Sequence, residues 1–152
     1  MKFTFIRHAE PEATGSHHSK WNIKPIYEEA VVEAKSVMPK PCIVYTSPAE
    51  RAYATARVLY NDSCTIKLIP LLKQREAPLE TEKMFEERVR TALITLFQHG
   101  KENNYNNLFV VCHSQFINVV DKLFNNVVNK TYNYLDTLTI EYNGDTKDFI
   151  YE

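Results

Sequence analysis

Glycine is scarce in this chain. Only three of its 152 residues are glycine, and these three, Gly15, Gly100 and Gly144, lie far apart. A dinucleotide-binding fingerprint, a phosphate-binding P-loop and a G-x-S-x-G nucleophile elbow each need glycines within a few residues of one another, for tight turns or close backbone approach. The glycine spacing therefore excludes all three motifs.

Cysteine is equally rare. The three cysteines, Cys42, Cys64 and Cys112, form no disulfide framework and fit a reducing compartment. No cysteine has an arginine six positions later, which argues against a cysteine phosphatase with a C-x5-R loop. We therefore expect a cytoplasmic protein whose chemistry does not use a cysteine nucleophile.

Long apolar runs and excess charge are also absent. No apolar stretch approaches the roughly 20 residues that span a bilayer, and the first residues lack a signal-peptide pattern. The net charge of −1 gives no general electrostatic reason to bind nucleic acid or an acidic membrane. Because domains run to roughly 100–200 residues, we expect one globular domain over residues 1–152.

Apolar stretches typical of strands alternate with stretches of helical periodicity. Strands are predicted at 2–6, 42–46, 65–69 and 108–112, and a C-terminal hairpin at 138–142 and 149–151 turns at Asn143-Gly144. Helices are predicted at 26–37, at 47–59, from Thr81 to about 98, and after residue 112. This alternation indicates an α/β domain with a largely parallel sheet and an antiparallel hairpin at one edge.

Two of these helices have marked ends. Ser47 is the expected N-cap of the second helix, with Pro48 in the first helical position and Glu50 completing an S-x-x-E capping box. Gly100 is the expected stop of the third helix.

Polar side chains follow several of the predicted strands. Arg7 and His8 follow the first strand, Arg51 lies one helical turn after the second, Glu76 comes after the third, and His113 follows the fourth. Ligands of open α/β sheets bind beyond the carboxyl ends of the strands. Two imidazoles and two guanidiniums at this edge suit a phosphoryl group, because guanidinium forks match phosphate oxygens and imidazole can attack phosphorus.

Three segments carry a family resemblance. Residues 5–10, F-I-R-H-A-E, resemble the R-H-G/A signature of the histidine phosphatase (phosphoglycerate mutase-like) superfamily. Residues 47–56, S-P-A-E-R-A-Y-A-T-A, resemble its S-P-x-x-R-A-x-x-T-A segment, and residues 110–114, V-V-C-H-S, resemble its V-x-x-H-G/S segment. Their order matches across nearly the whole chain, which implies a three-layer α/β/α sandwich of the phosphoglycerate mutase-like type.

The resemblance implies a role for each matching residue. His8 would be the nucleophile that is transiently phosphorylated, and Arg7, Arg51 and His113 would hold the phosphoryl oxygens. No metal or other cofactor is implied, because the arginines supply the positive charge. To attack phosphorus, His8 must be neutral, with its other ring nitrogen donating to an acceptor such as a backbone carbonyl.

The general acid is less clearly marked. The family usually places an acid after the strand that follows the S-P-x-x-R helix, and residues 72–79, L-K-Q-R-E-A-P-L, resemble an R-E-A-x-L variant that selects Glu76. An alignment to the L-x-E pattern would instead put Gln74 at that position. Glu80 and Glu82 remain alternatives.

The chain departs from the family pattern at several positions. Ala9 replaces the commoner glycine, a form familiar in the small phosphohistidine-phosphatase branch, and Ser114-Gln115 replaces the usual glycines of the last motif. His17 and His18 lie in the loop after the first motif and are candidates for substrate contact. A zinc site using these histidines is not favoured, because no metal-type spacing supports it.

These features predict a phosphatase that acts on a small phosphorylated substrate. The chain lacks long insertions over the site, which favours hydrolysis over transfer between substrate hydroxyls. Two alternatives stay open. One is a phosphohistidine phosphatase that acts on a protein, and the other is a phosphate-binding module without effective catalysis.

Overall fold

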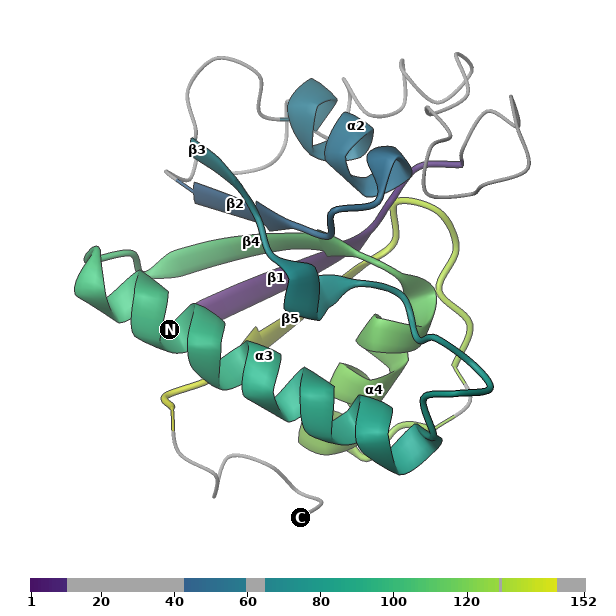
Figure 1. Ribbon diagram of the computed structural model, residues 1–152. Helices are drawn as coiled ribbons and strands as arrows, with labels where there is room; N and C mark the ends of the chain where they lie inside the picture. The colour runs from purple at the N-terminus through teal and green to yellow at the C-terminus, as the bar shows by residue number, and fades with distance from the viewer. Residues whose placement is uncertain (11–42, 60–64, 129, 145–152) are drawn as a thin grey trace.

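The computed structural model describes residues 1–10, 43–59, 65–128 and 130–144. Five strands form one sheet in the order β3-β2-β4-β1-β5 (Figure 1). The strands are β1 (Lys2–Arg7), β2 (Ile43–Thr46), β3 (Thr65–Leu68), β4 (Asn107–Cys112) and β5 (Thr137–Glu141). All neighbouring strands are parallel except β1 and β5, which are antiparallel. The predicted parallel sheet with an antiparallel edge strand is confirmed.

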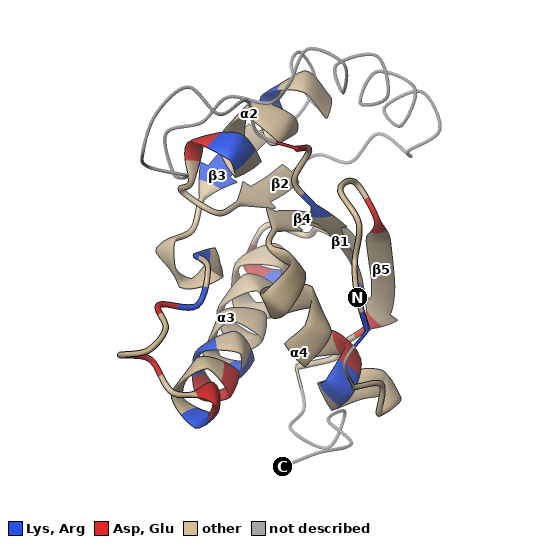
Figure 2. Ribbon diagram, turned by 90° about the vertical axis from the view of Figure 1, so that its right-hand side faces the viewer, with Lys and Arg blue, Asp and Glu red and all other residues tan. Residues whose placement is uncertain are grey.

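The helices lie on both faces of this sheet. Helix α2 (Glu50–Leu59) covers one face, while α3 (Glu82–Glu102) and α4 (Ser114–Asn125) cover the other (Figures 1 and 2). A 3-10 turn, η2 (Pro70–Leu72), links β3 to the segment before α3. The predicted three-layer α/β/α sandwich is therefore confirmed.

The sequence of the central strands explains why both faces are covered. Strands β2 and β4 carry no charged residue (Figure 2). Val110 and Cys112 of β4 pack in the core with α3 and α4, whereas Phe109 and Val111 pack with α2. A parallel strand with two apolar faces must be covered on both sides to keep its side chains out of water.

Two residues predicted to mark helix ends, Ser47 and Gly100, have other roles in the structure. Helix α2 begins at Glu50, later than predicted, and the Ser47 N–H donates to the Val111 carbonyl at 3.0 Å instead of joining a capping box. Helix α3 begins after Thr81, whose side chain caps it as the prediction of its start implies, but it continues through Gly100 to Glu102. Gly100 is buried where Leu108 and Met1 approach, so it serves close packing rather than termination.

Other predicted elements lie outside the described residues. These are the helix at 26–37 and the second hairpin strand at 149–151. The first hairpin strand is β5, which pairs with β1. None of the described helices has the length and apolar character needed to cross a membrane.

Candidate functional site

Three side chains from distant parts of the chain meet at the carboxyl edge of the sheet. His8 follows β1, Arg51 lies in the first turns of α2, and His113 follows β4. The two imidazole rings lie 5.2 Å apart between centroids, at 66° to each other, and Arg51 Nε lies 3.2 Å from His8 Nε2. All three residues are at most 5% exposed. The structure thus brings together the residues that the sequence singled out.

Hydrogen bonds fix the tautomer of His8. Its Nδ1 donates to the Ala9 carbonyl at 2.8 Å, and its Nε2 accepts from Arg51 Nε. Burial lowers the pKa of His8 to about 4, with the charges of Arg51 and Arg7 adding to the effect against the opposing bond to Ala9. The ring is therefore neutral at pH 7, and the Nε2 lone pair faces the arginine.

His113 is held as a neutral imidazole in the same way. Its Nε2 forms a 2.8 Å hydrogen bond with the hydroxyl of Ser47. Burial, reinforced by the neighbouring His8 and Arg51, lowers the pKa of His113 to about 2. Its Nδ1 is buried and has no hydrogen-bond partner among the described residues. Ser47, predicted as a helix cap, thus contacts a site histidine.

Arg7 reaches the same region from the end of β1. Its Nη1 donates to the Tyr132 carbonyl, and its guanidinium carbon lies 4.1 Å from the centre of the Tyr134 ring. The Tyr134 ring also lies 5.8 Å from that of His8. Neither tyrosine was singled out from the sequence, because both lie in an irregular segment without periodicity or motif.

Both arginines retain buried N–H groups that have no acceptor. Arg7 Nε and Arg51 Nη1 are buried and lack a hydrogen-bond partner within the described part of the chain. A buried donor without an acceptor is costly, and the cost is larger when the group is charged. These two donors therefore favour an anion with several oxygen acceptors, such as a phosphoryl group.

Thr55 connects the first two motifs. Its hydroxyl accepts from the Ala9 N–H at 2.9 Å and donates to the Arg51 carbonyl at 2.8 Å. The threonine of the S-P-x-x-R-A-x-x-T-A segment therefore holds the backbone after His8 against the helix that carries Arg51.

A cavity of about 460 Å³ opens beside these groups, and two predicted residues lie in its wall. Its lining is Ser47, Pro48, Ala49, Arg51, Lys73, Gln74, Arg75, Glu76 and His113. Glu76 is 62% exposed and forms a 2.8 Å ion pair with Lys73. Gln74 Oε1 accepts from Arg51 Nη2. Gln74 thus contacts Arg51 directly, whereas Glu76 pairs with Lys73.

The structure separates the other two acids from this cavity. The Glu80 carboxylate accepts two 2.8 Å hydrogen bonds from Arg88, which lower the pKa of Glu80 to about 2. With its pKa lowered this far, Glu80 is ionised at neutral pH and does not line the cavity that contains Arg51 and His113, which does not suit a proton donor. Glu82 starts α3 and lines a second cavity of about 390 Å³. Of the three acids considered, only Glu76 lines the cavity that contains Arg51 and His113.

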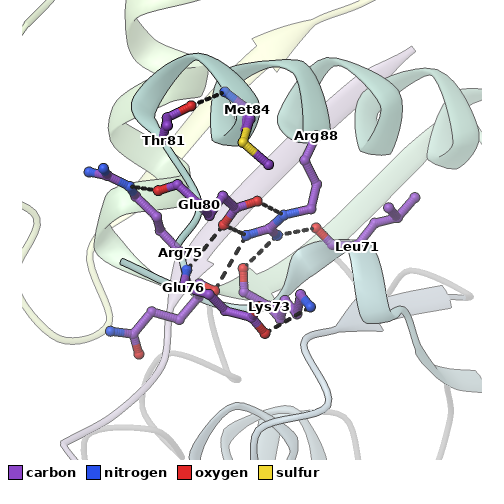
Figure 3. Close-up of polar contacts among 9 residues, drawn as sticks. Leu71, Lys73, Arg75, Glu76, Glu80, Thr81, Met84 and Arg88 are labelled. Carbon is purple, nitrogen blue, oxygen red and sulfur yellow. Dashed lines mark hydrogen bonds and ion pairs between the residues drawn. The ribbon is translucent and has the colours of Figure 1, made fainter. Parts of the chain in front are cut away.

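Arg88 organises the segment that carries Gln74 and Glu76. Besides Glu80, it donates to the carbonyls of Leu71, Lys73 and Gln74, at 2.8, 2.7 and 3.3 Å (Figure 3). Glu80 in turn accepts from the Glu76 N–H at 3.1 Å. The sequence does not predict this role, because Arg88 occupies an ordinary polar position of an amphipathic helix.

The remaining candidates stand apart from this cluster. His17 and His18 lie outside the described residues. Cys112 is fully buried, and burial raises the pKa of its thiol, which is consistent with a core residue. Within ranges 1–10, 43–59, 65–128 and 130–144, no group of three or more His, Cys, Asp or Glu side chains could hold a metal ion.

Comparison with known proteins adds evidence at the level of the fold. No protein-family model matches the chain, and no curated protein matches it in sequence. Solved structures do match. The alpha-ribazole phosphatase from Shigella flexneri has a TM-score of 0.71 and 18% identity, over 94% of this chain and 91% of that chain. The protein histidine phosphatase SixA, complexed with tungstate, has a TM-score of 0.69 and 14% identity, over 96% and 91%.

A third structure extends the comparison to another activity. The phosphoglycerate mutase from Bacillus anthracis strain Sterne has a TM-score of 0.70 and 11% identity, over 97% of this chain and 94% of that chain. All three are histidine phosphatase superfamily members. The chain therefore has the phosphoglycerate mutase-like fold, and the fold implied by its three motifs is confirmed.

Proposed function

We propose that this chain hydrolyses small phosphomonoesters and that His8 carries the phosphoryl group between two half-reactions. The observation that carries the proposal is the fixed tautomer of His8. Its Nδ1–H is held by the Ala9 carbonyl, so the lone pair of a neutral ring lies on Nε2, beside Arg51. A nucleophile needs this lone pair in a site that also stabilises the developing charge, so Arg51 Nε exchanges its bond to Nε2 for one to a phosphoryl oxygen when the ester binds.

In the first half-reaction, His8 Nε2 attacks phosphorus. The N–P bond forms while the ester P–O bond breaks, and the leaving oxygen takes a proton from the carboxyl group of Glu76. Arg7 and Arg51 donate to the equatorial oxygens, where the charge of the transition state is spread. The buried donors Arg7 Nε and Arg51 Nη1, which have no partner among the described residues, support this assignment.

In the second half-reaction, a water molecule attacks the phosphohistidine. Glu76, now a carboxylate, takes one proton of the water as its oxygen bonds to phosphorus. The N–P bond breaks, its electron pair returns to Nε2, and inorganic phosphate leaves. His113 acts as a base in neither step. Its neutral ring instead contributes a hydrogen-bonding group to the phosphoryl oxygens.

One observation favours a second candidate, a phosphatase of protein phosphohistidine. Of the candidate positions for the acid, the one whose side chain contacts Arg51 is Gln74, and its amide cannot supply a proton. A phosphohistidine substrate needs this proton less, because its imidazole can be protonated beforehand on the distal nitrogen and then depart neutral. The match to SixA, described as a protein histidine phosphatase, lends support at the level of the fold.

Turnover of phenyl phosphate, with and without a chelator, tests the proposal. We expect metal-independent release of phosphate and, in the wild-type chain quenched during turnover, an acid-labile phosphoryl group on the protein. His8→Ala should lower kcat/KM by at least about 10³-fold, because the nucleophile is lost. His99→Gln is the matched control, since His99 contacts Tyr45 and Lys67 rather than the cavity.

The alternatives give different results. Faster turnover of a phosphohistidine peptide than of phenyl phosphate would favour the protein phosphatase. Phosphate affinity by calorimetry, without turnover of either substrate, would leave only a binding module. Full activity in His8→Ala would refute the covalent route.

A further inference from the structure

Arg75 presents a guanidinium that the site described above does not use. Its Nε donates to the Glu80 carbonyl at 3.0 Å. Its two terminal nitrogens have no hydrogen-bond or ion-pair partner among the described residues. The residue lines both the cavity with Arg51 and His113 and the second cavity between α3 and α4. It therefore stands at the junction of the two.

The position of Arg75 is fixed by its neighbours. Arg88 holds the carbonyls of Lys73 and Gln74, directly before Arg75, and Glu80 joins Arg88 to the backbone N–H of Glu76, directly after it. In Figure 3 the Arg75 guanidinium points away from the Arg88–Glu80 pair. A cation that is already held in place loses little side-chain entropy when it binds a ligand.

The charges of the first cavity exceed what one phosphoryl group requires. Its lining carries three cationic side chains, Arg51, Lys73 and Arg75, and one carboxylate, Glu76. Lys73 and Glu76 pair with each other. Arg51 lies beside His8 Nε2, where the proposed function puts the phosphoryl group. Among the described residues, Arg75 is then the cation of this wall that has neither a countercharge nor a part in holding the phosphoryl group.

We propose that Arg75 binds a second anionic group of the substrate, a carboxylate or a second phosphate, so that the preferred substrates are phosphomonoesters with such a group. This inference rests on the proposed function. The charges of the second cavity limit where the anion can lie, because its Lys122 is already paired with Glu86 at 3.1 Å and its Glu82 disfavours negative charge beyond Arg75. The second anion therefore binds at Arg75 itself, at the junction, rather than deeper between α3 and α4.

Binding of non-hydrolysable phosphonates, measured by calorimetry, tests this inference without requiring turnover. One series consists of n-alkylphosphonates, the second of ω-carboxyalkylphosphonates, and the third of alkane bisphosphonates, each with two to four methylene groups. In the wild-type chain, the carboxylate or bisphosphonate series should bind at least about tenfold more tightly than the alkyl series at the best length, as expected for a charge-assisted bidentate contact.

Two variants show whether Arg75 causes the preference. Arg75→Gln should bind all three series equally. Arg57→Gln removes the same charge from the exposed last turn of α2, which does not line the cavity, and should keep the wild-type preference. A preference that survives in Arg75→Gln, or its absence from the wild-type chain at every length, would overturn the inference.

The same measurements keep the two proposals apart. Turnover of phenyl phosphate without any preference for a second anion refutes the role of Arg75 alone. A preference for a second anion without turnover of any ester refutes the hydrolysis alone. The length at which the preference is greatest, and whether a carboxylate or a phosphonate gives it, would identify the second group.

Discussion

The ion pair between Glu80 and Arg88 gives a quantitative prediction about stability. In Glu80→Gln, one of the two charge-assisted hydrogen bonds from Arg88 is lost and the negative charge is removed, while the bonds from Arg88 to the backbone carbonyls can remain. The pKa of Glu80 is lowered from 4.5 to about 2, mainly by the hydrogen bonds from Arg88. At about 1.4 kcal/mol per pKa unit, the full shift corresponds to about 3 kcal/mol.

The expected loss is smaller than this upper value. Glu80 and Arg88 are 13% and 11% exposed, so water screens part of the interaction, and the glutamine oxygen can still accept one hydrogen bond. We expect Glu80→Gln to lower the free energy of unfolding by about 2 kcal/mol at pH 7. Urea denaturation followed by circular dichroism measures this difference.

The pH dependence of this loss has a definite sign. Because folding lowers the pKa of Glu80, its contribution is complete above about pH 4.5 and is lost as the pH falls towards 2. The difference between the wild-type chain and the variant should therefore shrink by more than about half between pH 7 and pH 3.

A control on the same helix separates this effect from a general change of charge. Glu87→Gln, at an exposed position of α3, should change the stability by less than about 0.5 kcal/mol. A Glu80→Gln difference that stays constant from pH 7 to pH 3, or that equals the control, would refute the reasoning.

Three further predictions concern the site and the backbone. In Glu76→Gln, where the proposed general acid no longer titrates, kcat/KM for the substrate dianion, corrected for substrate ionisation, should be constant from pH 8 to about 5 and reach half its value near pH 4, because the pKa of His8 is about 4. A fall with a midpoint near 6.5 would contradict the neutral-ring assignment. Arg51→Lys keeps the charge but loses the planar fork, so steady-state assays should show kcat/KM reduced by about 10²-fold, and near-normal activity would argue against a bidentate contact. In thermal unfolding, Gly144→Ala should destabilise the chain by about 2 kcal/mol more than Gly100→Ala. At Gly144, where φ is +78°, an added Cβ would lie 2.5 Å from the Phe97 ring, whereas at Gly100 the closest atoms are 3.1 Å away and the higher helix propensity of alanine offsets the crowding. Equal losses would show that the contact with Phe97 is readily relieved.

The sequence predicted those features that depend on local pattern. The continuous apolar run at 108–112 indicated a strand covered on both faces, and β4 has that environment. The motif residues His8, Arg51 and His113 follow strands whose carboxyl ends share one edge, so their convergence follows from the parallel topology.

Features that depend on packing between distant segments could not be predicted in this way. Ser47 has the sequence of a helix cap, but its N–H and hydroxyl are used by β4 and the following histidine. Gly100 has the sequence of a helix stop, but the small residue is required by the approach of Leu108 and Met1. Neither partner can be identified from the residues that flank these positions.

The general acid could not be assigned from the sequence for a related reason. Gln74, Glu76, Glu80 and Glu82 lie within nine positions, where local patterns do not indicate which side chain faces the cavity. The contacts of Arg88, which lies on α3, determine how this segment folds back. Local spacing alone cannot reveal an interaction with a side chain from the following helix.

The position of β1 in the sheet has a consequence for the order of folding. This strand lies between β4 and β5, so its partners come from residues about a hundred or more positions later. The chain must lose the entropy of closing such long loops before the strand contacts can stabilise it, which slows folding. A ribosome-bound chain that has emerged only as far as α3 therefore lacks both partner strands, and His8 and His113 cannot meet until β4 has been added.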